Sequence, residues 1–281
     1  MIPERRIRAG APLFCYNGNR RYLERVMEPA MNITWNAADY EKNFSFVHRY
    51  GENVLEMVEE GNGGLAVDLG CGTGPLTPGL KEKGYRVLGI DESAQMVEAA
   101  RTAHPDLTFM QGNALTFSLE EKAEVIFSNA VFHWIDAAMQ DALARNLAAQ
   151  LSPGGMLVTE FGGKGCAEAV HSTLEICFHE KGLVYPRVFY FPTIGEYAPV
   201  LEKAGFKVVF ASLFDRPTPQ NTRDGLTDWI RMFVKKPFEG MDEALKSEIL
   251  SETEDRLRSR LYVDGRWYID YVRIRVKAVR A

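Results

Sequence analysis

The stretch Val67-Asp68-Leu69-Gly70-Cys71-Gly72-Thr73-Gly74-Pro75 decides the fold of this chain. It follows the apolar run 65–67 and precedes a segment of helical character, so it predicts a strand, a glycine turn and a helix start. Three glycines at alternate positions allow positive φ and let the backbone approach a ligand closely. Pro75 suits the first turn of the following helix. The free N–H groups at such a helix start attract the polar or anionic part of a nucleotide-like ligand.

The glycine spacing differs from the dinucleotide-binding fingerprint G-x-G-x-x-G, because the third glycine comes one residue early and Pro75 stands in its place. The pattern resembles motif I of the class I S-adenosylmethionine (SAM) dependent methyltransferases. The resemblance assigns these residues to cofactor binding: Asp68, Gly70, Cys71, Gly72 and Gly74. The alternative is a glycine turn that only packs a helix on a sheet.

A second predicted strand, 85–90, ends at Asp91-Glu92. A carboxylate at the tip of the strand after the glycine turn accepts hydrogen bonds from the two ribose hydroxyls of an adenosine ligand. The spacing from Gly70 to Asp91 is close to the spacing that dinucleotide folds use for the same purpose. Ser93 then caps a predicted helix that carries Met96, and the resemblance places Met96 over the adenine. We therefore expect Asp91, Glu92 and Met96 to bind SAM.

The next two predicted strands extend the cofactor site. Strand 108–111 is followed by Asn113-Ala114, where methyltransferases usually carry Asp-Ala and the side chain meets the adenine amino group. Asn113 departs from this pattern, but its carbonyl oxygen is still an acceptor. Strand 123–128 runs into Asn129, which the resemblance places near the methionine part of SAM and the transferring methyl group. The resemblance covers roughly residues 32 to 281.

Methyl transfer from a sulfonium needs no nucleophile from the protein, but donor and acceptor must be held in line and water must be excluded. A general base matters only for an acceptor that is protonated at working pH. His133 is the candidate base near the expected methyl position, and the alternative is a histidine that packs or positions substrate. Trp134 is expected to form a pocket wall.

Two cations are candidates to hold an acidic acceptor, because burying an unpaired anion is costly. Lys164 follows the predicted fifth strand, 156–161, in a glycine-rich segment. Arg231 lies on the polar side of a predicted helix that carries Trp229 and Phe233. For Lys164 the alternative is an ordinary solvated lysine.

Composition limits the classes of protein that fit. The chain has 281 residues, 46 % of them hydrophobic, which is enough for one large domain or a domain with a cap. A net charge of −5 argues against nucleic-acid binding, and no apolar run is long enough to span a membrane. The four cysteines form no CxxC pair, and the spacing within 166–179 matches no zinc template. We therefore expect a cytoplasmic protein, a monomer or homodimer, without a metal, that acts on a small molecule.

The first thirty residues differ from the rest, with six arginines against three glutamates and no core-forming pattern. Residues 31–37 resemble the natural beginning of enzymes related to trans-aconitate methyltransferase. Residues 1–30 are therefore expected to be a flexible extension or the product of a misplaced start codon, with a targeting presequence as the alternative. Residues 31–281 are expected to be the methyltransferase domain.

Strand and helix patterns alternate from residue 65 to residue 214, which predicts a parallel sheet with helices on both faces. Residues 272–278 alternate between apolar and basic side chains after an Asp264-Gly265 turn, which predicts an antiparallel strand with one solvated face. Two segments, about 162–195 and 216–260, are too long for plain connections and predict a helical cap above the carboxyl ends of the strands. The expected fold is an α/β Rossmann-like methyltransferase sheet, mostly parallel, with one antiparallel strand near its edge.

The leading hypothesis is an enzyme (EC 2.1.1.-) that transfers a methyl group from SAM to a small-molecule acceptor, similar to trans-aconitate methyltransferase, with a carboxylate as one candidate acceptor. A nicotinamide-dependent oxidoreductase is the first alternative, and Pro75 argues against it. A non-catalytic SAM-binding protein is the second alternative, and it would lack an open acceptor pocket.

Overall fold

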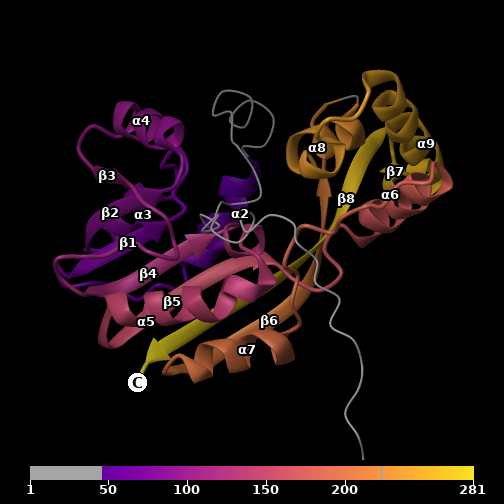
Figure 1. The fold of residues 1–281 in the computed structure, drawn as a ribbon. Helices are drawn as coiled ribbons and strands as arrows, with labels where there is room; N and C mark the ends of the chain where they lie inside the picture. The colour runs from indigo at the N-terminus through magenta and orange to yellow at the C-terminus, as the bar shows by residue number, and fades with distance from the viewer. Residues whose placement is uncertain (1–45, 223) are drawn as a thin grey trace, which may run out of the picture. The chain divides into compact units, whose positions relative to one another are not determined.

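A computed structural model describes residues 46–222 and 224–281 of the chain. The predicted extension 1–30 and the expected domain start at residue 31 lie outside the described residues. The described part contains a central sheet with helices on both faces and a group of helices at one end of its two longest strands (Figure 1).

The sheet has the order β3-β2-β1-β4-β5-β8-β6, with the short strand β7 paired to β8. The strands are β1 (Leu65–Leu69), β2 (Arg86–Asp91), β3 (Thr108–Gln111), β4 (Ala123–Asn129), β5 (Leu151–Gly162), β6 (Phe206–Pro219), β7 (Tyr262–Val263) and β8 (Arg266–Arg280). Strands β1 to β5 pair in parallel, and β8 is antiparallel to both β5 and β6. This confirms the predicted mostly parallel sheet with one antiparallel strand near its edge.

Helices cover both faces because the central strands are buried on both sides. The helices against the sheet are α2 (Phe46–Leu55), α3 (Thr77–Glu82), α4 (Ala94–Ala103), α5 (Gln140–Gln150) and α7 (Ile194–Lys203). Two short 3₁₀ turns, η1 (Phe132–Trp134) and η2 (Ala137–Met139), lie between β4 and α5. One core contains residues of α5 and α7, and a separate core contains residues of α2 and α3, so the sheet separates two helical layers.

Local sequence signals explain where several helices begin and end. Ser93 caps α4, its side chain accepting the N–H of Met96 at 3.3 Å. Thr193 and Glu196 form the predicted capping box of α7. Gly205, with a φ of 93°, follows the end of that helix. The placement of Pro75 was wrong, since α3 begins two residues later and its first turn contains Pro78 instead.

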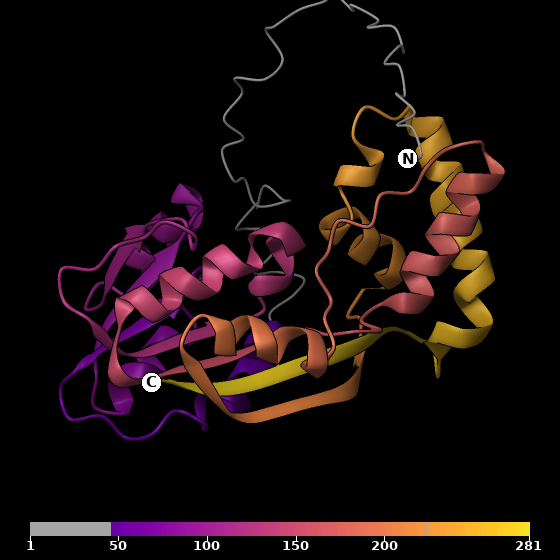
Figure 2. The same ribbon diagram turned by 60° about the horizontal axis from the view of Figure 1, so that its bottom comes forward.

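The helical group at the end of the long strands consists of α6 (Glu168–Glu180), α8 (Gly225–Phe233), the turn η3 (Lys236–Phe238) and α9 (Glu243–Leu261). These helices share one apolar core with the end of β8, and the buried stripe of α8 includes Trp229 and Phe233. We call these helices the cap. Pairing of β8 with β5 ends at Gly162, but pairing with β6 continues to Pro219. The two extended strands therefore carry the cap beyond the rest of the sheet (Figure 2).

The end of the chain differs from the expected strand with one solvated face. The hairpin is as predicted, with φ of 49° at Asp264 and 79° at Gly265 between β7 and β8. The basic side of β8 is not a solvated face, however, because α2 and the residues after it lie beside it. Arg275 Nη1 donates to the carbonyl oxygen of Asn53 in α2 at 3.5 Å. Lys277 Nζ donates to the carbonyl oxygen of Met57 just beyond α2, and Arg273 is only 6 % exposed.

Candidate active site

A cavity opens at the carboxyl ends of β1, β2 and β4 and continues to the cap. Its first half is formed by residues predicted to bind the cofactor: Asp68, Gly70, Cys71, Gly72, Asp91, Met96 and Asn129. We call this the cofactor half. Pro75 and Leu76, just beyond the glycine turn, also line the cavity. The rest of the lining comes from residues 130 to 273 and includes His133, Trp134 and Arg273. We call it the acceptor half.

The three glycines of the turn all have positive φ but play different structural roles. A Cβ atom at Gly70 would lie 2.2 Å from the side chain of Val131, and one at Gly74 would lie 3.0 Å from Phe109. A Cβ at Gly72 would meet nothing within 4 Å, because this residue faces open space. Gly70 and Gly74 are therefore required for packing, whereas Gly72 leaves room in the cavity for a ligand.

Asp91 at the end of β2 is held by two backbone donors. Gly72 N donates to Oδ2 and Ser93 N donates to Oδ1, each at 2.9 Å. Burial raises the pKa of this carboxyl, and the two hydrogen bonds oppose that shift. Each oxygen keeps a further lone pair, so the fixed carboxylate can accept two hydroxyl groups of a ribose.

Asp68, in β1 just before the glycine turn, is almost fully buried, with 3 % exposure. Its Oδ2 accepts the hydroxyl hydrogen of Thr77 at 2.7 Å, which ties β1 to the start of α3. Burial raises the pKa of Asp68 to about 7, and the hydrogen bond from Thr77 opposes the rise. Beside it, burial also raises the pKa of the Cys71 thiol.

Four of the predicted cofactor residues do not line the cavity: Gly74, Glu92, Asn113 and Ala114. Asn113 donates through Nδ2 to Glu92 Oε1 at 2.8 Å, and its Oδ1 accepts the N–H of Leu115 at 2.8 Å. The carbonyl oxygen that was expected to meet the adenine therefore serves the turn after β3. Ala114 packs against the apolar core under α5.

SAM fits the cofactor half on these observations. The open space at Gly72 admits a ligand against the backbone, and the oriented carboxylate of Asp91 offers two acceptors for a diol. Met96 is 3 % exposed and supplies an apolar surface for a flat ring.

Aromatic side chains surround the acceptor half. Phe189 and Phe191 are stacked, with ring centroids 5.3 Å apart and planes 3° apart, and Trp134 meets Phe189 edge-on at 5.0 Å. Trp229 and Phe233 approach from α8, and Tyr271 comes from β8. Trp229 Nε1 donates to the Tyr271 hydroxyl at 2.6 Å.

His133 lies in η1 and is 7 % exposed. Its Nδ1 accepts the N–H of Gly162 at 3.3 Å. A neutral ring with an acceptor at Nδ1 carries its proton on Nε2, so His133 is assigned as a hydrogen-bond donor. Burial, and secondarily the positive charge of Arg273, hold its pKa well below the usual range. This geometry favours a neutral donor over the general base considered from the sequence.

Arg273 was not predicted as a site residue, yet it is the cation that lines the cavity. Its guanidinium lies 4.4 Å from the centre of the Tyr271 ring, and its Nε has no hydrogen-bond partner among the described residues. No carboxylate in the described part of the chain forms an ion pair with it. Two nearby arginines, by contrast, do have a carboxylate partner: Arg216 and Arg275 both pair with the buried Glu160, at 2.5 and 2.6 Å.

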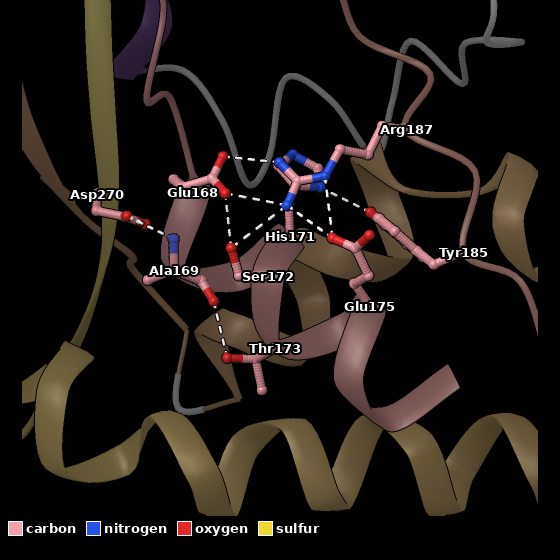
Figure 3. A network of polar contacts seen from close by, with 9 residues as sticks. All are labelled: Glu168, Ala169, His171, Ser172, Thr173, Glu175, Tyr185, Arg187 and Asp270. Carbon is pink, nitrogen blue, oxygen red and sulfur yellow. Dashed lines mark hydrogen bonds and ion pairs between the residues drawn. The ribbon is translucent and has the colours of Figure 1, made fainter. Parts of the chain in front are cut away.

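The two cations predicted from the sequence lie elsewhere. Lys164 is exposed and borders a smaller depression with Glu168, His171 and Arg187. In that depression Arg187 is held by Glu168 and Glu175 at 2.7 and 2.9 Å (Figure 3). Arg231 is exposed and borders another depression, between α8 and α9. Neither lines the main cavity, and both side chains are exposed.

Residues 46–222 and 224–281 contain no group of three or more His, Cys, Asp or Glu side chains placed to hold a metal ion. Within the same residues, no helix has the length and apolar character needed to cross a lipid bilayer.

Comparison with known proteins agrees with this geometry. Residues 66–155 match the family model described as a methyltransferase domain. The chain is 28 % identical over 256 residues to an uncharacterized methyltransferase of Schizosaccharomyces pombe, covering 87 % of this chain and 97 % of that protein. It is also 28 % identical over 270 residues to trans-aconitate 2-methyltransferase of Delftia acidovorans, covering 88 % and 99 %.

The fold is shared with solved structures. Magnesium protoporphyrin IX methyltransferase from Synechocystis, solved with bound S-adenosylhomocysteine, aligns with a TM-score of 0.50 and 20 % identity, covering 83 % of each chain. The cofactor of this chain is SAM. The methyltransferase matches argue against the two alternatives, a nicotinamide-dependent oxidoreductase and a non-catalytic SAM-binding protein. Together these findings support a SAM-dependent methyltransferase of class I that resembles the trans-aconitate methyltransferases.

Proposed function

We propose that this enzyme methylates a carboxylate oxygen of a small-molecule acceptor held by Arg273. The single observation that carries the proposal is a buried cation that faces the cavity without a counterion among the described residues. A buried charge left unpaired is costly. Arg216 and Arg275, by contrast, both form ion pairs with Glu160. An anionic acceptor would supply the missing partner of Arg273.

In this proposal SAM occupies the cofactor half, with its ribose on Asp91 and its adenine beside Met96. The glycine turn lies against the ligand, and Gly72 provides the space for it. Asn129 closes this half where β4 ends, next to the first residue of the acceptor half. The methyl group would thus be presented at the boundary between the two halves.

His133 and Arg273 together form the polar end of the acceptor half. Both residues line this half, and the positive charge of Arg273 contributes to the lowered pKa of His133. A guanidinium binds a carboxylate in bidentate geometry, and the Nε2–H of His133 offers one further donor. Gly162 fixes the ring by donating to Nδ1, so that donor is oriented before the acceptor binds.

The chemistry agrees with a histidine that donates rather than accepts a proton. When bound, SAM supplies a methyl group activated by a positively charged sulfur. A carboxylate oxygen forms the new bond to the methyl carbon, while the carbon–sulfur bond breaks and its electron pair stays on sulfur. The products are a methyl ester and S-adenosylhomocysteine, and no proton is released. The protein's task is to align the reactants and exclude water, which the aromatic walls support.

The relative from Delftia acidovorans supports the same acceptor class, because the name trans-aconitate 2-methyltransferase denotes a carboxylic acid substrate. We further propose that the cap covers the acceptor, since Trp229 and Phe233 of α8 line the cavity.

The test is to incubate the enzyme with methyl-labelled SAM and separate pools of carboxylic acids, alcohols and amines. We expect label in the carboxylic acid pool, and we expect alkali to release it as methanol, because esters hydrolyse and ethers or N-methyl groups do not. Label that withstands alkali, in any pool, would contradict the proposal.

A further inference from the structure

The charges around the cavity limit how many carboxylates an acceptor can carry. Among the described lining residues Arg273 is the cation, whereas the acidic side chains Asp68 and Asp91 belong to the cofactor half. His133 is held neutral by its burial. A tricarboxylate would bring two more negative charges than this cation can pair, and each unpaired charge would be buried at a high cost.

The aromatic walls add few free donors for extra carboxylate oxygens. Trp134 Nε1 already donates to the carbonyl oxygen of Ala130 at 3.2 Å, and Trp229 Nε1 donates to the Tyr271 hydroxyl. Phe189, Phe191 and Phe233 have no polar atom in their side chains. The indole N–H groups are therefore committed to the protein, and the walls present mainly ring surface.

Other cations near the cap are kept away from the cavity. Phe189 and Phe191 line both the main cavity and the depression that contains Lys164, so this stacked pair forms the partition between them. On the far side of the partition, Arg187 is paired with Glu168 and Glu175 (Figure 3). A second carboxylate in the main cavity would thus face phenyl rings rather than Lys164 or Arg187.

The rings of the partition also favour a flat acceptor. Phe189 and Phe191 lie in nearly parallel planes, and Trp134, Trp229 and Tyr271 add further ring faces and edges. Aromatic and conjugated groups gain more from such contacts than from their buried area alone.

We infer that the acceptor is a monocarboxylate with a flat, conjugated or aromatic body, rather than a tricarboxylate. This inference rests on the proposed function and narrows it: the carboxylate pairs with Arg273, and the flat body lies among the rings of the acceptor half.

The test compares methyl ester formation from a series of flat monocarboxylates, with trans-cinnamate as the first member, and from trans-aconitate. Cinnamamide serves as the neutral control. We expect kcat/KM for the best flat monocarboxylate to exceed that for trans-aconitate by at least tenfold, and no methylation of the amide. Equal or faster esterification of trans-aconitate would overturn the inference while leaving the carboxylate proposal intact. So would the absence of ester from every flat monocarboxylate. Methylation of the amide or of alcohols alone would instead contradict the proposed function.

A variant separates ring contacts from charge. Phe191→Leu removes one stacked ring but no charge, and we expect the KM for the best flat acid to rise about two- to tenfold. The KM for hexanoate, a saturated monocarboxylate, should change less than twofold. A thermal melt with S-adenosylhomocysteine verifies that the variant folds and keeps the cofactor half. An equal rise in KM for both acids would contradict the assignment of a flat acceptor.

Discussion

The two halves of the cavity are built in different ways. The cofactor half comes from one continuous stretch, Asp68 to Asn129, in which the parallel strands β1, β2 and β4 end at the same edge of the sheet. The acceptor half joins η1, the segment before α7, helix α8 and strand β8, which are far apart in the chain. The cofactor half is specified by local spacing, whereas the acceptor half depends on how distant elements pack. Substitutions in the two halves should therefore affect different ligands.

The largest expected effect is on SAM binding. Gly72→Val would place a branched side chain in the open space at φ 57°, so we expect SAM affinity to fall at least about a hundredfold, or about 3 kcal/mol. Isothermal titration calorimetry measures the loss. Gly182→Val is the matched control, because Gly182 has a φ of 71° and open space around it but lies beyond α6. Equal loss in both variants would show that backbone strain, not ligand space, is responsible.

A smaller loss is expected at the end of β2. Asp91→Ala should weaken SAM by about 1.5–3 kcal/mol, the range for hydrogen bonds to a charged group, and should leave the KM of the acceptor unchanged. Equilibrium binding and initial rates at saturating SAM separate the two effects. Asp106→Ala removes an exposed carboxylate paired with Lys81 and should change neither value. Unchanged SAM affinity in a folded Asp91→Ala protein would refute the ribose assignment.

In the acceptor half, His133→Ala should raise the acceptor KM about three- to tenfold, because it removes one oriented donor. Since its pKa is held well below the usual range, the wild-type histidine stays neutral from pH 7 to 9. The kcat should therefore stay flat across that interval in both proteins. A limb near neutral pH that disappears in the variant would identify His133 as a general base, and the acceptor would then not be a carboxylate.

The smallest effect concerns stability rather than binding. The pKa of Asp68 is raised to about 7 in the folded protein, so the folded state holds this proton more tightly than the unfolded state. The associated stabilisation is complete below the unfolded pKa and is lost as pH rises through about 7. The loss of this stabilisation between pH 6 and pH 8.5 should amount to about 1 kcal/mol. Thermal melts should show a smaller loss of Tm over this interval for Asp68→Asn than for wild type, and parallel losses would contradict the assignment.

The same contrast explains which features the sequence predicts. The glycine turn, Asp91 and the capping box at Thr193 depend on neighbours a few residues away, and the structure places each as predicted. Arg273 escaped prediction because alternation along 272–278 fits a solvated strand face equally well. In the structure that side chain is only 6 % exposed, because segments distant in the sequence gather around the cavity that it lines. Lys164 and Arg231 carry the right charge, but no local pattern shows that they point away from the cavity.

The proposed reaction depends most on Arg273 as the partner of an anionic acceptor. The most direct measurement is kcat/KM for the best carboxylic acid acceptor in Arg273→Gln, with Lys164→Gln and Arg231→Gln as controls and the SAM dissociation constant measured in each. We predict a loss of about thirtyfold or more for Arg273→Gln, which corresponds to about 2 kcal/mol for one partner of a buried ion pair. SAM affinity should stay within about twofold, and both controls should match wild type. An unchanged kcat/KM in a folded Arg273→Gln protein, or an equal loss in either control, would contradict the account.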